Sequence, residues 1–302
     1  MSRSRGNISV VLLGIGLFLA AVAHLVMVCV VRTTQLEMEN LRDRQLRLLC
    51  SSVITRLAQQ ELESGECTPV TLTIQPGNVP ATLVSNVTYS DDGCFCYLGA
   101  RVEAEKQSHH LRHVKFQLNE EMQEQGKRFV LISRKPLIGS EFLSEEGIYT
   151  STEEVHIPQI ECLKNTSTAK LSISDLSMED VKLYGLDKRF YYLSNASTPL
   201  TFSKNLKVQG TAVIATEGSV IIESGCQFFD KVIFISKGNI IIKDGVKLPQ
   251  VLLLAYGKVT IGTDCQLGGV VFSDSNIELL GNSTLVHDGD VVARISSAFY
   301  IL

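Results

Sequence analysis

The sequence predicts a mainly β protein with one long N-terminal α-helix. A transmembrane helix should extend into a stalk, followed by a small antiparallel sheet and a C-terminal parallel β-helix, or solenoid, of about four coils. Three observations predict this architecture: an apolar run at 8–31, stretches of period-two alternation between 68 and 133, and a repeated unit within 206–302. Helices and strands place side chains with different periods, so a change of period along the chain indicates a change of element.

Residues 8–31, ISVVLLGIGLFLAAVAHLVMVCVV, form the predicted transmembrane helix, and residues 1–7 form a short N-terminal tail. The only ionisable side chains in the apolar run are His24 and Cys29. As a helix the run is about 36 Å long, enough to cross a hydrocarbon core of about 30 Å. A cleaved secretory signal is the alternative, but the apolar region of such signals has about 7 to 15 residues. Arginines flank the run on both sides, so charge alone leaves its orientation open.

Residues 32–64 form the predicted amphipathic continuation of this helix, because they contain neither glycine nor proline. Four apolar residues recur at helical spacing and form a stripe that needs a partner surface. They are Leu46, Leu49, Val53 and Leu57. The helix should end near Gly65.

Residues 65–135 are predicted to form an antiparallel β region, since apolar and polar residues alternate between turn signals such as SDDGC at 90–94. Residues 102–105 and 114–118 are predicted as the arms of a hairpin whose apolar face receives the helix stripe. Residues 136–205 are a mixed connecting region with short strands or a short helix over 172–181.

Residues 206–302 are predicted to form the β-helix repeat domain. Aligning Gly218, Gly238, Gly257 and Ser275 gives units spaced by 20, 19 and 18 residues and brings pairs of apolar residues into common register. These pairs are Val220 and Ile222, Ile240 and Ile242, Val259 and Ile261, and Ile277 and Leu279. One unit cannot bury its own apolar face, so neighbouring units must stack as coils about 4.8 Å apart. A sandwich of ordinary hairpins is the alternative, but it does not account for the shared register.

The N-terminal region, residues 3–60, resembles PilX-type minor pilins and similar type IV pilus assembly proteins. The resemblance is carried by Arg5 and Gly6 before the apolar run and by a juxtamembrane N-x-R-D-R-x-L segment. The matching residues of that segment are Asn40, Arg42, Asp43, Arg44 and Leu46. It implies prepilin-type processing at Gly6, a cytoplasmic tail, and a helix packed against a small antiparallel sheet outside the membrane.

Residues 206–290 resemble polymer-forming β-helix proteins of the bactofilin type, through the repeat pattern rather than a motif. This second resemblance implies a membrane-associated scaffold in the cytoplasm whose coils polymerise end to end.

Histidines and cysteines are the residues that most resemble a reactive site. His109, His110 and His113 lack a further ligand at metal-binding spacing, so a solvated hairpin tip is expected. In an oxidising compartment, Cys67 could pair with Cys94 or Cys96 and fasten the helix end to the sheet. Two more cysteines, Cys226 and Cys265, occupy the same place in coils two apart. A disulfide between them would have to span roughly 9 to 10 Å, so they should be unpaired core residues.

The expected function is therefore structural rather than enzymatic, with no catalytic residue, metal or cofactor. A net charge of −4 gives no reason to expect a nucleic-acid partner. The first hypothesis is a minor-pilin-like component of a type IV pilus or related secretion filament. It would be anchored by a single pass in the inner membrane with its C-terminal domain outside, and its partners would be the bilayer and filament subunits.

Three alternatives remain open. The first is a membrane-anchored, bactofilin-like scaffold that self-associates. The second is an enzyme or adhesin with a carbohydrate groove, although the repeat faces offer only Tyr256 and scattered Asp and Lys. The third is a type II glycoprotein, if the chain is eukaryotic. Its sequons are at Asn86, Asn165, Asn195 and Asn282.

Overall fold

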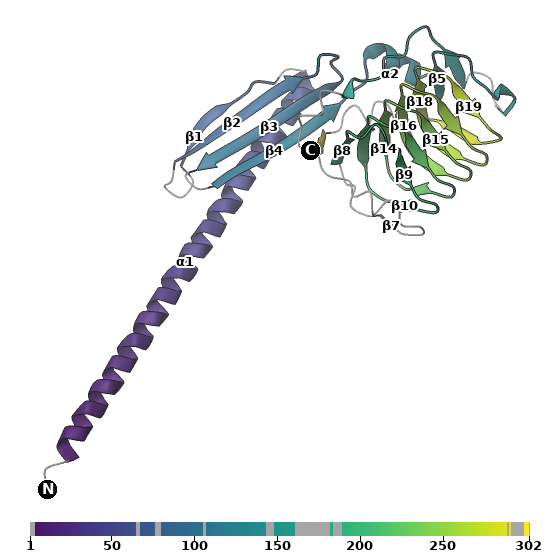
Figure 1. Ribbon diagram of the computed structural model, residues 1–302. Coiled ribbons are helices and arrows are strands. Elements are labelled where there is room, and N and C mark those ends of the chain that lie inside the picture. The colour runs from purple at the N-terminus through teal and green to yellow at the C-terminus, as the bar shows by residue number, and fades with distance from the viewer. Residues whose placement is uncertain are drawn as a thin grey trace.

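The computed structural model describes residues 4–64, 67–75, 80–104, 107–142, 148–160, 182–183, 189–288, 290 and 299–301. The suggested helix at 172–181 and the sequon at Asn165 lie outside these residues. The chain has three parts: a long projecting helix, a small antiparallel sheet on its C-terminal half, and a parallel solenoid beside that sheet (Figure 1). This confirms the predicted fold class.

Helix α1 runs from Ser4 to Ser64 without interruption and ends where Gly65 was expected to end it. Its two halves differ in what surrounds them. Large apolar side chains from Leu12 to Val31 are exposed, whereas the second half buries one stripe against the sheet. The buried members of that stripe are Leu46, Cys50, Ile54 and Leu57, with Leu49 and Val53 partly buried beside them.

The antiparallel sheet has the strand order β1-β2-β3-β4. Its strands are β1 (Thr71–Ile74), β2 (Ala81–Tyr89), β3 (Phe95–Ala104) and β4 (Gln107–Phe116). Alternation along β3 turns Cys96, Leu98, Ala100 and Val102 toward α1, and this face buries the helix stripe as predicted. The β3–β4 pairing runs from Phe95↔Phe116 to Ala104↔Gln107, so the hairpin is longer than the predicted arms.

The solenoid presents three rows of parallel strands. The first row contains β8 (Arg189–Leu193), β11 (Ala212–Thr216), β14 (Val232–Ser236), β16 (Lys247–Ala255) and β18 (Gln266–Ser273). The second contains β9 (Leu200–Phe202), β12 (Val220–Ile222), β15 (Ile240–Ile242), β17 (Val259–Ile261) and β19 (Ile277–Leu279). The third contains β7 (Lys182–Leu183), β10 (Lys207–Val208), β13 (Gln227–Phe228), the starts of β16 and β18, and β20 (Thr284–His287).

The predicted register of the repeat is confirmed: Val220 pairs with Ile240, Ile240 with Val259 and Val259 with Ile277. The units shorten in the turn between the third and first rows. The step from 20 to 19 residues falls between Gln227 and Val232, whose partners are in β16. The step from 19 to 18 falls between Leu248 and Val251, where β16 carries one more residue than β18. The inward residues form one continuous core.

The coil count was too low, because the solenoid has about six turns rather than four. It begins upstream of residue 206: Leu200 and Phe202 occupy the places that Val220 and Ile222 occupy one coil later. In this earlier coil Thr198 stands at the place of the turn glycine Gly218, and β8 contains aromatic residues, so the coil does not share the repeated pattern.

Both ends of the first row are covered by strands from elsewhere in the chain. At one end β18 pairs with β5 (Leu131–Ser133), and β5 pairs with β6 (Tyr149–Ser151). Residues 128–133, RFVLIS, were expected to belong to the antiparallel β region at 65–135. That prediction was wrong, because β5 within this segment pairs with β18 of the solenoid. At the other end β21 (Phe299–Ile301) pairs with β4 on one side and meets β8 on the other, which joins the two sheets. The short helices α2 (Glu120–Gly126) and η2 (Ser140–Phe142) lie in the connecting segment.

Candidate functional site

The exposed half of α1 is the first candidate for a functional surface. Leu13, Phe18, Leu25 and Met27 are among its exposed side chains, and no described part of the chain covers them. By length and composition, α1 is long enough and apolar enough to cross a membrane. Gly6, the predicted processing residue, lies within the first turns of the same helix.

The juxtamembrane residues sit where the helix reaches the hairpin. Asn40 and Arg44 are exposed, whereas Arg42 and Asp43 are half-buried. The Asp43 carboxylate lies 2.6 Å from Nε2 of His109 on β4 and 2.9 Å from Nε of Arg47. The Nε and Nη2 atoms of Arg42 are buried and have no hydrogen-bond partner among the described residues. Asp43 therefore fastens the helix to the end of the hairpin, a local role that the motif did not reveal.

The three histidines differ from the expected solvated tip. They lie within β4 rather than in the turn, and only His110 is exposed. His113 is half-buried, and burial lowers its pKa. Burial, followed by the neighbouring Arg101 and Arg112, lowers the pKa of His110 as well. No group of three or more His, Cys, Asp or Glu side chains in the described ranges could hold a metal ion.

A buried polar cluster lies where the C-terminal end of α1 meets the sheet. Glu61 is only 4% exposed and lies 3.5 Å from Nζ of Lys115, itself buried on β4. The Tyr89 hydroxyl donates to Oε2 of Glu61 at 2.7 Å, and the Cys67 thiol lies 3.5 Å from the same oxygen. Buried charges are costly unless they are paired and hydrogen-bonded, and here three groups satisfy one carboxylate.

The pKa values of two thiols in this cluster, Cys67 and Cys96, are raised. Burial, reinforced by the hydrogen bond to Glu61, raises the pKa of Cys67 to about 11. Burial, together with the charge of Glu61, raises the pKa of Cys96 to about 12. Sequence reasoning missed this cluster, although Glu61 follows Leu57 by four residues and thus continues the buried stripe. A carboxylate at an apolar position of a helix stripe is the signal that would have found it.

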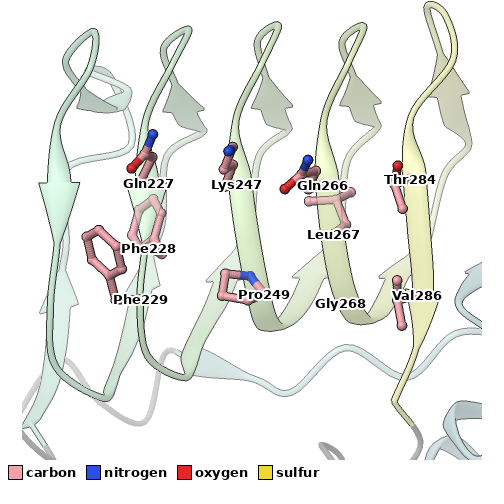
Figure 2. A pocket seen from close by; sticks show the side chains of 10 residues that line it. All are labelled: Gln227, Phe228, Phe229, Lys247, Pro249, Gln266, Leu267, Gly268, Thr284 and Val286. Atoms are coloured by element: carbon pink, nitrogen blue, oxygen red, sulfur yellow. The ribbon is translucent and has the colours of Figure 1, made fainter.

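The third row of the solenoid carries a groove of about 390 Å³ on its outer side. Figure 2 shows its lining as two rows that cross neighbouring coils. Gln227, Lys247, Gln266 and Thr284 form the polar row, and Phe229, Pro249, Gly268 and Val286 form the apolar row. Phe229 is 56% exposed and Val286 is 55% exposed.

Gly268 allows its coil to run close to the neighbouring backbone at the groove. A Cβ at this position would lie 2.1 Å from the carbonyl oxygen of Pro249. The next residue, Gly269, has φ of +136°, a conformation that favours glycine. The groove can offer apolar contact from Phe229 and hydrogen-bond donors from the polar row. Tyr256, the aromatic residue expected on a repeat face, is instead half-buried and donates to the carbonyl oxygen of Ile157 at 2.9 Å.

Among the described cysteines none is disulfide-bonded, and Cys226 and Cys265 are buried core residues as predicted. A scan against protein-family models gave no match to this chain, and searches of the curated proteins and of the solved structures gave none either.

Proposed function

We propose that this chain is a non-enzymatic, membrane-anchored structural protein, a minor-pilin-like component of a type IV pilus or related secretion filament, with its β domains outside the membrane. The observation that carries the proposal is the division of α1. Residues 12–31 of the helix are mostly apolar and exposed on every side, whereas its second half is packed against an antiparallel sheet. An element of this kind can insert its free half in a bilayer or among other helices while the other half holds a folded head.

The head supports a structural role. The solenoid buries a continuous apolar core. In its first row the two end strands are paired, β18 with β5 and β8 with β21. The alternative, a bactofilin-like scaffold, would polymerise through uncovered solenoid ends. In the second row the end strand is also contacted, because Ile138 bridges to Glu278 and exchanges backbone hydrogen bonds with Ile277 and Leu279. Among the described residues β7, β9 and β20 have no strand on their outer side, so the rows are covered only in part. The covered end at β18 and β19 favours display over end-to-end polymerisation through that end.

Orientation is the first test of this proposal. Lys243, at an exposed turn after β15, can be replaced by cysteine and treated with a membrane-impermeant maleimide on intact host cells. We expect Lys243→Cys to be labelled above the wild-type background. The matched control, Asn7→Cys, lies before the apolar run, stays on the chain after processing at Gly6 and should be labelled only after permeabilisation. The reverse pattern would contradict an external head.

Filament association is the second test. Shearing host cells should release the chain with the filament fraction, and disrupting the apolar half of α1 with Leu17→Arg should abolish this release. The matched control Leu48→Arg changes an exposed residue of the packed half, outside the apolar run, and should leave membrane insertion intact. Retention of the wild-type chain in the cell membrane after shearing would argue for an anchored protein that is not part of a filament.

A further inference from the structure

The polar cluster at the end of α1 brings together two thiols that differ in access. Cys67 follows the helix and is half-buried, whereas Cys96 on β3 is fully buried. The Cys67 sulfur contacts Oε2 of Glu61, and that oxygen also accepts the Tyr89 hydroxyl. Tyr89 stands directly opposite Cys96 in the β2–β3 register, close enough for its hydroxyl to influence the pKa of the Cys96 thiol. The two sulfurs are thus both adjacent to one pair of oxygen atoms.

We propose that Cys67 and Cys96 are a redox pair that closes into an intramolecular disulfide, with Cys67 as the attacking thiol and Cys96 as the resolving thiol. Exposure assigns the roles, because only the half-buried Cys67 can be reached by an external oxidant. Cys94, the other partner considered from the sequence, is excluded by its surroundings. Its sulfur faces the backbone of Asp92 and it packs with Phe95 and Phe116 on the opposite side of the sheet.

The chemistry requires an external disulfide as co-reactant, either a small molecule or a protein. The Cys67 thiolate attacks one sulfur of that disulfide, which breaks its S–S bond and releases one thiolate. The Cys96 thiolate then attacks the Cys67 sulfur of the mixed disulfide and releases the second thiolate. The protons lost by Cys67 and Cys96 end on the two released thiols. The chain's dithiol is oxidised and the external disulfide is reduced.

The cross-link would have a structural consequence. The closed loop from 67 to 96 contains β1 and β2 whole, so the bond would tie both strands to the end of α1. Constraining such a loop restricts the unfolded chain more than the folded one. Glu61 would lose the Cys67 donor but keep Tyr89 and Lys115. We therefore expect oxidation to raise the unfolding temperature of the helix–sheet unit.

The test uses the full-length chain in detergent, reduced and then incubated with oxidised glutathione. After acid quenching and alkylation, peptide mass spectrometry should find a Cys67–Cys96 cross-linked peptide. Cys96→Ser should instead accumulate glutathione on Cys67, because the resolving thiol is missing. Cys94→Ser is the matched control and should form the cross-link like wild type.

Two results would overturn the proposal. The first is a folded wild-type chain, by circular dichroism, that forms no Cys67–Cys96 peptide while Cys96→Ser takes up no glutathione. The second is a cross-link from Cys67 to Cys94. The rate gives an independent readout: the raised pKa of Cys67 predicts that mixed-disulfide formation rises about a hundredfold between pH 7 and pH 9 and keeps rising above pH 9. If the rate of mixed-disulfide formation levels off below pH 9, Cys67 is not the attacking thiol in the buried surroundings described. The assay involves no filament, so its failure and that of the proposed function are distinguishable.

Discussion

The solenoid and the helix–sheet unit bury their side chains in opposite ways. The solenoid stacks similar coils, so each inward position is filled by apolar residues of the same kind, such as Val220, Ile240 and Val259. The helix–sheet unit joins two unlike elements once, and its interface includes the charges of Glu61 and Lys115. Repetition lets one pattern specify many contacts, whereas a single junction needs individual partners.

The largest effect should come from the aromatic centre of the solenoid. Phe234 is fully buried and makes edge contacts with Phe202 and Phe228 at 5.6 and 5.8 Å. Phe234→Ala should lower the free energy of unfolding by about 4 kcal/mol, since the space left by the ring is not refilled. Urea unfolding of the full-length chain in detergent measures this. The control Phe229→Ala, at an exposed position, should change it by less than about 0.5 kcal/mol. Equal losses for both would show that the core is not packed as described.

A slightly smaller loss should follow from breaking the buried ion pair. Lys115→Met leaves the Glu61 carboxylate buried without its cation and should cost about 3 kcal/mol in unfolding free energy. The double variant Glu61→Leu with Lys115→Met should recover much of that loss, because no buried charge remains. Urea midpoints of the single and double variants provide the comparison. If the double variant is no more stable than Lys115→Met, the charges are not the source of the cost.

A loss of about 1 kcal/mol is expected in the segment that connects the two regions. Asn119 caps α2 by accepting the backbone N–H of Met122 at 2.9 Å. Asn119→Ala removes this acceptor from the helix N-terminus and should destabilise the chain by about 1 kcal/mol. Asn119→Asp keeps an acceptor and should stay near wild type in the same thermal unfolding measurement. A full loss in both variants would indicate that the cap is not what Asn119 contributes.

The smallest effect is the acid sensitivity of one coil turn. The Asp244 carboxylate accepts the backbone N–H of Thr263 at 2.8 Å, and this hydrogen bond lowers its pKa below 3.8. Because the folded pKa is the lower one, its stabilisation is complete above pH 3.8 and is lost as the pH falls through the folded pKa. Asp244→Asn should therefore flatten the dependence of the urea midpoint on pH below 4. An unchanged slope would assign the acid sensitivity to other carboxylates.

The same contrast explains how much could be predicted from the sequence. In the solenoid, Val and Ile recur at 18 to 20 residue spacing, and that spacing alone places them in register. The coil that contains Leu200 and Phe202 was missed because stacking, not glycine, defines a coil. Strand β5 was misplaced because its partner β18 is distant in sequence, and a short apolar run does not indicate which edge it will pair with.

In the helix–sheet unit the sequence predicted the surfaces but not the contacts between them. The stripe from Leu46 to Leu57 was expected to face the sheet, and it does. The pairing of Asp43 with His109 and of Glu61 with Lys115 depends on how the helix axis crosses the strands. No spacing along the chain encodes that crossing.

The strands that cover the solenoid edges also set an order of events during synthesis. Leu131 pairs with Val271, and Val114 pairs with Tyr300, so β5 and β4 are made long before their partners. At about 5 to 20 residues per second, the ribosome needs roughly 7 to 28 s to make the intervening chain for β5 alone. During that interval the nascent chain carries two unpaired strand edges that can join another copy. If α1 is the membrane anchor proposed above, it keeps neighbouring nascent chains in one plane, and crowding there is the condition under which this chain would be most prone to aggregate.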